Sequence, residues 1–411
     1  MALFAYFCNF FTSAMKPTKA MTANAVDETQ RHPLLANRIA FLIIGFLEAA
    51  WAPLVPYVKS SFSLDEGTLG LLMLCSGLGS ICALPLAGGL ANRYGAKRVV
   101  FVSGTLMCLA LLVIGLMWNV WLTGAMLMVF GGCTIAIDVA ANVNGIALER
   151  ATGRHLMSGF HGGYSLGTLA GAGAVSIMFA LGLLPIWAVV VSIALVLSAM
   201  VLGCRDLLDG RTGADKERKE KTAIRRKGIP PLVVVVGLLC FIMYAAEGAV
   251  MGWSAVFVSQ ERGVDMKTAG FFYTAFAITM TAMRLCGDSI VGRLGRRRVV
   301  AGGALLIAGG FGTVVFGNST LAAAAGFGMV GIGAANVVPQ LVSFAADIKG
   351  MAVHNTISLI NALGYSGILL GPVVIGFVAK EWGLSMSFGG IALLSLVVAG
   401  IAAAILRDNE K

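Results

Sequence analysis

The sequence predicts an all-α membrane protein with twelve transmembrane helices in two six-helix, pseudo-symmetric halves. Composition, the length of the apolar stretches and an internal repeat support this prediction. Of the 411 residues, 58% are hydrophobic and 12% are charged, whereas a soluble domain is roughly half apolar and about a quarter charged. Helices that face lipid accommodate such an excess, because hydrocarbon solvates their outer surface.

Twelve apolar stretches are long enough to cross a bilayer, which takes about 20 residues each. They cover residues 37–58, 68–91, 98–117, 119–148, 157–181, 184–203, 230–258, 268–291, 299–317, 320–346, 354–379 and 384–406. An even number of spans places both termini on the same side of the membrane.

Basic residues indicate which side that is. The loops on the same side as the termini hold most of the 30 Lys and Arg residues, and such loops are normally cytoplasmic. We therefore expect both termini of this multi-pass protein in the cytoplasm, at the inner (plasma) membrane. The net charge of +10 is spread over short loops without a folded basic domain, so we expect no nucleic-acid partner.

One long hydrophilic interval divides the chain. The predicted parts are a cytoplasmic leader (1–36), an N-terminal half (37–204), a cytoplasmic linker (205–229), a C-terminal half (230–406) and a cytoplasmic tail (407–411). The linker is rich in charge and needs no packed core. The apolar first twenty residues fit neither a secretory signal nor a span, which leaves Met15 and Met21 open as alternative starts.

Several short motifs occur twice, in the same order. The basic turn containing Arg93, Gly95, Lys97 and Arg98 recurs with Arg293, Gly295, Arg297 and Arg298; Glu48 recurs as Glu247, and His161 as His354. Because separate matches in one order are improbable by chance, the chain is predicted to be an internal duplication.

Twelve spans, a basic central linker and the turn "GGLANRYGAKR" together resemble the major facilitator superfamily. The family's loop motif maps onto Gly88, Asn92, Arg93, Gly95, Lys97 and Arg98. Asn92 stands where the family has an aspartate. In the second half Gly292 occupies that position, and Asp288 lies one helical turn earlier, before Arg293 and Gly295.

The stretches "SGFHGGYSLGTLAGAG" and "EGAVMGWSAVFVSQ" resemble those of a bacterial branch of the superfamily, which contains uncharacterised inner-membrane transporters and rhizopine-uptake-type membrane proteins. This resemblance implies a small hydroxylated or amino-bearing solute. It also implies that the loop motif locks helices on the cytoplasmic side through charge pairs. Because Asn92 is not anionic, that lock is expected to be weaker in the first half; alternatively, the basic residues only set the topology.

Ionisable groups inside spans point to a functional site, because each costs at least about 2.5–3.5 kcal/mol to insert. The spans contain Glu48, Asp138, Glu247 and Arg284. The resemblance implies that the first, fourth, seventh and tenth helices line a cavity, which adds Asn336 and Gln340. A carboxyl group there can carry a proton or bind an amino group, with Arg284 as a counter-ion; alternatively, these residues form static pairs.

Weaker candidates lie on or near the same helices. Asn142, Trp51 and Trp253 could contact a solute, and His161 and His354 could form a cytoplasmic gate. An interfacial anchor or a hydrogen bond to a loop carbonyl explains several of them equally well.

Other chemistry finds no support in the sequence. The cysteines form no CxxC pair or His/Cys cluster, so neither a metal nor a cofactor is expected. A P-loop and a nucleophile elbow are both missing, so the chain is not predicted to be an enzyme. Gly163, Gly167 and Gly171 form a stripe where a helix can approach closely. The glycines of 326–331 match a dinucleotide motif but lack its βαβ context, and are read as helix packing.

The predicted function is secondary active transport of a sugar, cyclitol or amino-cyclitol, coupled to protons and carried out by a monomer through alternating access. Drug or metabolite efflux by antiport is the alternative. The fifth span lacks the Gly-Pro motif, and the fourth lacks the arginine, that such exporters often carry. A membrane receptor or sensor that moves no solute is an alternative of another class.

Overall fold

The computed structural model describes residues 28–153, 156–208, 229–351 and 353–406, and these residues form helices and short connections. The first half contains α2 (Glu28–Ala50), η2 (Ala52–Leu54), α3 (Val55–Ser61), α4 (Glu66–Tyr94), α5 (Ala96–Leu116), α6 (Val120–Thr152), α7 (Met157–Ala180) and α8 (Pro185–Gly203). The second contains α9 (Pro231–Glu261), α10 (Met266–Leu285), α11 (Gly287–Leu294), α12 (Arg296–Phe316), α13 (Thr320–Ala345), α14 (Val353–Trp382) and α15 (Leu384–Ile405). Most of the predicted leader, linker and tail lies outside the described residues.

Eleven helices of the described part are long and apolar enough to cross a membrane. The prediction of an all-α membrane protein is confirmed. The eighth span, predicted as one continuous helix over 268–291, is instead two helices, α10 and α11, separated at Cys286. α10, which carries Lys267, Arg284 and several threonines, is not among the eleven.

Helix starts follow local capping chemistry. The Asp65 carboxylate accepts a hydrogen bond from the Thr68 backbone N–H (2.7 Å), and Asn119 accepts from the N–H groups of Trp121 and Leu122. The first helix begins at Glu28, nine residues before the predicted span, and it contains Pro33 in its second turn.

The backbone reproduces the internal repeat. Gly95 has φ 83° and ψ 153°, and Gly295 has φ 79° and ψ 155°. Each ends one helix and precedes the next, in a left-handed conformation that glycine adopts without steric cost. The two copies of the basic turn therefore have the same shape.

Glycines set the closest helix contacts within each half. A Cβ atom on Gly167 or Gly171 would overlap the backbone carbonyl of Leu42 or Phe46, so α7 lies directly against α2. In the second half, Gly367 of α14 approaches Phe241 of α9 in the same way. The predicted stripe is confirmed. The glycines of 326–331 likewise pack against α10 and α12.

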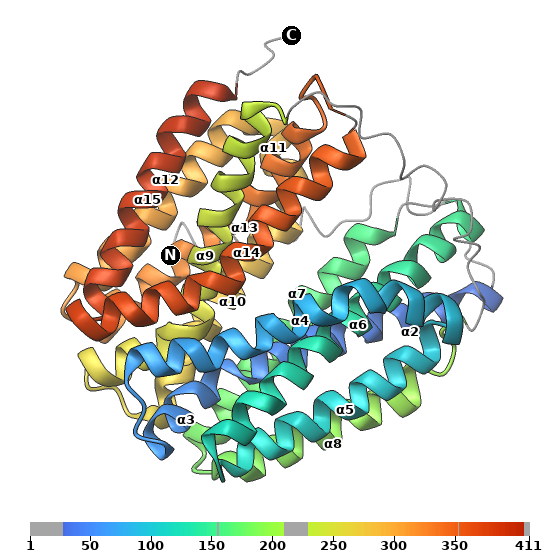
Figure 1. The fold of residues 1–411 in the computed structure, drawn as a ribbon, viewed down its shortest axis with the longest axis horizontal. Helices are drawn as coiled ribbons and strands as arrows, with labels where there is room; N and C mark the ends of the chain where they lie inside the picture. Colours follow the sequence, from blue (N-terminus) through green and yellow to red (C-terminus); the bar gives the residue numbers. More distant parts are fainter. Residues whose placement is uncertain (1–27, 154–155, 209–228, 352, 407–411) are drawn as a thin grey trace, which may run out of the picture.

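The two halves meet at one end and diverge toward the other (Figure 1). The diverging end carries the start of α2, the ends of α8 and α15 and the start of α9; we call it the linker face. The other end is called the opposite face. The halves touch mainly where α4 packs on α14 and where α7 packs on α10.

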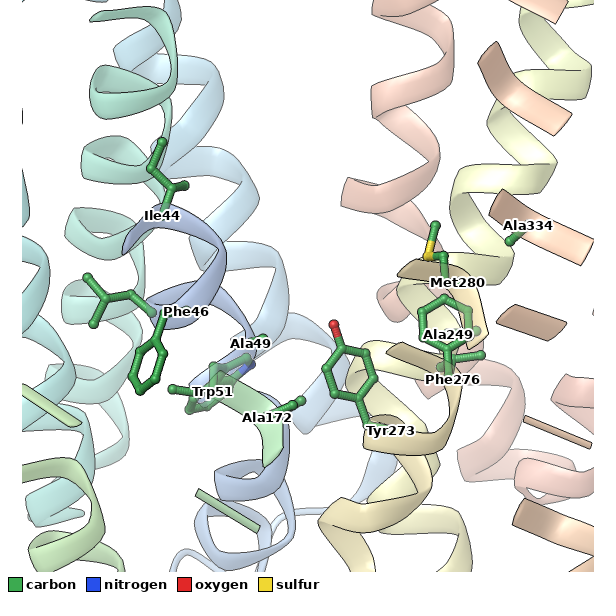
Figure 2. Packing of buried hydrophobic residues seen from close by; sticks show 14 of the residues in the cluster. Ile44, Phe46, Ala49, Trp51, Ala172, Ala249, Tyr273, Phe276, Met280 and Ala334 are labelled. Carbon is green, nitrogen blue, oxygen red and sulfur yellow. The ribbon is translucent and has the colours of Figure 1, made fainter. Parts of the chain in front are cut away.

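Buried apolar side chains fill the interior across this boundary. Figure 2 shows Trp51 and Ala172 of the first half facing Tyr273 of the second. All three belong to a core cluster that extends through both halves. The halves therefore share a packed contact in the part of α10 that is nearer to the opposite face.

Candidate functional site

Four charged residues predicted from the sequence lie near one another in the middle of the bundle. They are Glu48 on α2, Asp138 on α6, Glu247 on α9 and Arg284 on α10, here called the acid cluster. Glu48 interacts electrostatically with both Asp138 and Glu247, and Glu247 interacts with Arg284. Helices from both halves thus bring three carboxylates and one guanidinium together.

Glu48 is held by a phenol. The Tyr164 hydroxyl on α7 donates a hydrogen bond of 2.9 Å to Glu48 Oε2. Among the described residues, no basic side chain lies within ion-pair distance of Glu48. Its carboxylate is half-buried, so water reaches a group whose charge is offset only by dipoles.

Glu247 has a basic partner at longer range. Arg284 Nη2 lies 3.7 Å from Glu247 Oε1, and the two side chains are 32% and 27% exposed. Arg284 Nη1 also reaches Ser165 Oγ of α7 at 3.5 Å. Charge-assisted hydrogen bonds are normally about 2.7–2.9 Å long. Arg284 is therefore shared loosely between an acid of its own half and a hydroxyl of the other.

Asp138 is tied within its own helix. The Asn142 side-chain amide donates to the Asp138 backbone carbonyl (2.9 Å) and to Oδ1 (3.1 Å). Asn142 was predicted to contact a solute; in this structure its side chain bonds to Asp138.

Four of the seven tyrosines in the chain surround the acid cluster: Tyr164, Tyr244, Tyr273 and Tyr365, here called the tyrosine group. Tyr244 and Tyr365 stack with ring centroids 5.3 Å apart and an interplanar angle of 25°. Tyr365 remains 58% exposed although it lies mid-way along α14.

Sequence reasoning did not select Tyr164, Tyr273 or Tyr365. The available signal was their position, because tyrosines of membrane proteins usually lie at span ends, in the interface. A tyrosine deep within a span needs a polar partner for its hydroxyl. Here the acid cluster provides that polar surrounding.

Asn336 lies beside the break in the eighth span. Its amide donates to the Met283 backbone carbonyl (3.1 Å), and a Cβ atom on Gly287 would overlap its side-chain oxygen. The structure thus gives Asn336 a backbone partner at the junction of α10 and α11. Gln340, one turn further along α13, is half-buried.

The predicted tryptophans are in the core. Trp51 is 8% exposed and Trp253 is fully buried, with its indole nitrogen lacking a hydrogen-bond partner. His161 is exposed, lies edge-on to the Phe41 ring at 5.1 Å and interacts electrostatically with Arg284. The His354 side chain lies outside the described part of the chain.

The basic turns lie at the linker face. Arg93 stacks over Tyr94, 5.3 Å from the ring centroid, and no atom lies within 4 Å of a Cβ built on Gly88. Next to Gly295, Arg296 pairs with Asp347 (2.9 Å) and bonds to Ser343. These contacts stay within one half, and the Asp288 side chain is not among those described. The lock between helices of different halves stays a prediction.

Across the halves, an ion pair is found at the opposite face instead. Lys380 Nζ of α14 lies 3.2 Å from Asp65 Oδ2 at the start of α4. Next to it, Gly70 packs against Pro372 and Gly376 packs against Glu66. The described conformation is thus closed at the opposite face.

A family model, Major Facilitator Superfamily, matches residues 39–352 and 236–411. The chain belongs to this superfamily. It is therefore a membrane-embedded secondary transporter of a small molecule and not an enzyme. The helices that carry Glu48, Asp138 and Glu247 are the first, fourth and seventh of the superfamily fold.

Relatives support the assignment over nearly the full length. An uncharacterised MFS-type transporter of Yersinia pestis is 41% identical over 373 residues, covering 91% of this chain and 96% of that protein. Membrane protein MosC of Rhizobium meliloti is 29% identical over 371 residues, with 90% and 88% covered. The nucleoside transporter NupG has the same fold, with a TM-score of 0.71 at 14% identity, covering 90% and 98% of the two chains.

Proposed function

We propose that this transporter carries a small polar solute, of the sugar, cyclitol or amino-cyclitol type, together with protons into the cell. The observation that carries the proposal is Glu48: a half-buried carboxylate in the middle of the bundle, held by the Tyr164 hydroxyl and without a basic partner among the described residues. An intramembrane carboxylate of this kind is costly unless it functions.

Proton carriage follows from this environment. Glu48 is close enough to Asp138 and Glu247 for their charges to repel, and one proton on Glu48 relieves this repulsion. Glu247 instead has Arg284 to balance its charge. The two repeat-related glutamates are therefore expected to differ, with Glu48 exchanging the proton.

The solute class follows from the groups around the acid cluster. Three carboxylates accept hydrogen bonds, and they favour a solute rich in hydroxyl or amino donors. The stacked Tyr244 and Tyr365 offer an aromatic face to a ring. A ring with polar edges fits both features better than an extended apolar drug.

Orientation rests on the distribution of Lys and Arg. The loops of the linker face hold most of these residues, so we assign this face to the cytoplasm of a bacterial cell. The described conformation, closed at the opposite face through Asp65 and Lys380, is then the inward-facing one. Rocking of one half against the other would expose the acid cluster alternately. We expect the monomer to be sufficient.

The direction of proton movement tests the proposal. Proteoliposomes containing the purified transporter and a trapped pH indicator are exposed, at equal internal and external pH, to sugars, cyclitols, amino-cyclitols and cationic drugs. A symported solute acidifies the lumen, because protons enter with it. A solute exchanged for protons makes the lumen alkaline, which would favour the efflux antiporter.

Two further arms complete the test. Glu48→Gln should lose the solute-dependent proton movement. Glu381→Gln makes the same chemical change at an exposed position on the opposite face and is expected to behave like the wild type. A solute could bind to the detergent-purified protein but neither accumulate in vesicles nor move protons. That result would support a membrane receptor or sensor and contradict transport of that solute.

A further inference from the structure

The two repeat-related glutamates are joined by a short series of contacts that crosses between the halves. Glu48 accepts a hydrogen bond from Tyr164 (2.9 Å), and Ser165 is the next residue on α7. Ser165 Oγ meets Arg284 Nη1 (3.5 Å), and Arg284 Nη2 meets Glu247 (3.7 Å). One acid of each half therefore lies at each end of a connected path.

The Tyr164 end of this path is held rigidly. A Cβ atom on Gly45 would overlap the Tyr164 backbone carbonyl, so α2 and α7 touch less than one turn from Glu48. Gly167 and Gly171 continue this close contact along the pair. Because packed helices at this distance cannot slide, Glu48 and Tyr164 move as one unit.

The Ser165 end faces the other half. Ser165 is 5% exposed; its carbonyl accepts a hydrogen bond from Thr281 (3.2 Å), and its hydroxyl contacts Arg284. Both donors lie on α10. Of these two successive residues of α7, Tyr164 thus contacts Glu48 in the first half, and Ser165 contacts α10 in the second half.

Glu247 links Glu48 and Arg284 electrostatically, because it interacts with both. The titratable or charged groups around Glu48 come from five elements: Asp138 (α6), Tyr164 and His161 (α7), Glu247 (α9), Tyr273 and Arg284 (α10) and Tyr365 (α14). α8, which also packs on α2, carries no such group. Arg284 is the one cation at neutral pH among these described groups.

While Glu48 is ionised, it adds a negative charge on the first-half side of Arg284, which favours the contact of Arg284 with Ser165. A proton on Glu48 removes this charge, and Glu247, 3.7 Å from Arg284, then holds the guanidinium on the second half. Since both Arg284 contacts are longer than usual, a small change in field can shift it between them.

We propose that Tyr164 and Ser165 are positioning residues that connect the proton site at Glu48 to Arg284, so that protonation of Glu48 loosens the contact between α7 and α10. The proton comes from solvent on one side of the membrane and leaves to the other, and no covalent bond besides O–H changes. This inference rests on the proposed proton coupling.

Spin labels at Leu90 and Val353, both exposed near the linker face on α4 and α14, report the separation of the halves in a background without other reactive cysteines. In the wild type, the ratio of the two distance populations is expected to change at least about 5-fold between pH 8 and pH 5, the lower end of ordinary coupling between sites. Ser165→Ala and Tyr164→Phe should each lose most of this response, and Ser165→Thr, which keeps the hydroxyl, should restore it.

Thr281→Val provides the matched control, because it removes the neighbouring α10–α7 hydrogen bond without touching Arg284; it should keep the pH response. A wild-type response in Ser165→Ala, or a loss in Thr281→Val equal to that in Ser165→Ala, would overturn the inference. A wild type without solute-dependent proton flux would instead refute the proposed function. Coupled flux with an unaltered response in both Ser165→Ala and Tyr164→Phe would refute the inference alone.

Discussion

Lys380 Nζ lies 3.2 Å from Asp65 Oδ2 and joins the end of α14 to the start of α4 across the two halves. The two side chains are 47% and 43% exposed. Solvent screening limits such a pair to about 0.2–1 kcal/mol. The pair therefore biases the conformational equilibrium modestly and does not lock it.

Removing this ion pair should favour opening of the opposite face. In Lys380→Gln, the ratio of closed to open molecules at the opposite face is expected to fall about 1.4- to 5-fold, from the energy range of an exposed pair. Spin labels at the exposed Ser63 and Trp382 measure it. Lys59→Gln removes a pair of 3.0 Å with Glu66 inside one half and should leave the ratio unchanged. Equal effects of the two variants would contradict this role.

Mild acid should not weaken the ion pair between Asp65 and Lys380. The Thr68 backbone N–H, with Lys380 adding to it, holds the pKa of Asp65 below its ordinary value of 3.8. A lowered pKa means that the ionised form stabilises the folded contact above the ordinary pKa and that this stabilisation is lost only as the pH falls through the lowered value. The factor by which Lys380→Gln lowers the ratio of closed to open molecules, measured with the Ser63 and Trp382 labels, should thus be the same at pH 7 and pH 5. A smaller factor at pH 5 would show that Asp65 takes up a proton in this range.

The close contact of α2 with α7 should tolerate no added methyl group. Gly167→Ala is expected to destabilise the folded protein by about 1–3 kcal/mol, because the new atom overlaps the Leu42 carbonyl. Thermal unfolding in detergent measures the change. Gly312→Ala on α12 makes the same substitution where no atom lies within 4 Å and should unfold at the wild-type temperature or higher.

The break between α10 and α11 should depend on Asn336. Asn336→Ala leaves the half-buried Met283 carbonyl without its side-chain donor, and losing such a hydrogen bond costs about 0.5–1.5 kcal/mol. Hydrogen exchange of backbone amides in 283–290 is then expected to become about 2- to 12-fold faster. Asn142→Ala, whose bonds stay within α6, serves as control. Unchanged exchange in Asn336→Ala would assign the break to packing alone.

The stacked tyrosines should matter for solute affinity and not for proton movement itself. Tyr365→Ala is expected to weaken solute binding about 2- to 12-fold, from the 0.5–1.5 kcal/mol of an aromatic contact. Tyr365→Phe keeps the ring, so its solute affinity should fall by a factor near the lower end of that range. Isothermal titration with the solute found in the flux assay measures both. If Tyr365→Phe weakened solute binding as much as Tyr365→Ala, the contribution of Tyr365 to affinity would come from its hydroxyl and not from its ring.

Much of the fold could be predicted because its signals are local. Apolar stretches define spans, and the basic turn at Gly95 and Gly295 marks the repeat in sequence and in backbone angles. The break at Cys286 was missed because its contacts are not local in the sequence. Asn336, 53 residues further along the chain, donates a hydrogen bond to the Met283 carbonyl beside the break.

The candidate site was predicted in part for the same reason. Glu48, Asp138, Glu247 and Arg284 stand out because charge is rare in spans. Ser165 does not stand out, since a serine hydroxyl in a helix can bond to its own backbone and needs no tertiary contact. Tyr164 was missed although its place inside a span was a signal. Trp51 and Trp253 show the reverse: their helices approach the acid cluster, but packing turns both rings into the core.

The most direct test of the central claim is solute accumulation driven by an imposed pH gradient, in wild-type and Glu48→Gln proteoliposomes, alongside exchange of labelled for unlabelled solute without a gradient. Proton coupling through Glu48 predicts that the variant loses gradient-driven accumulation but still exchanges solute. Accumulation in Glu48→Gln that equals the wild type would contradict the account.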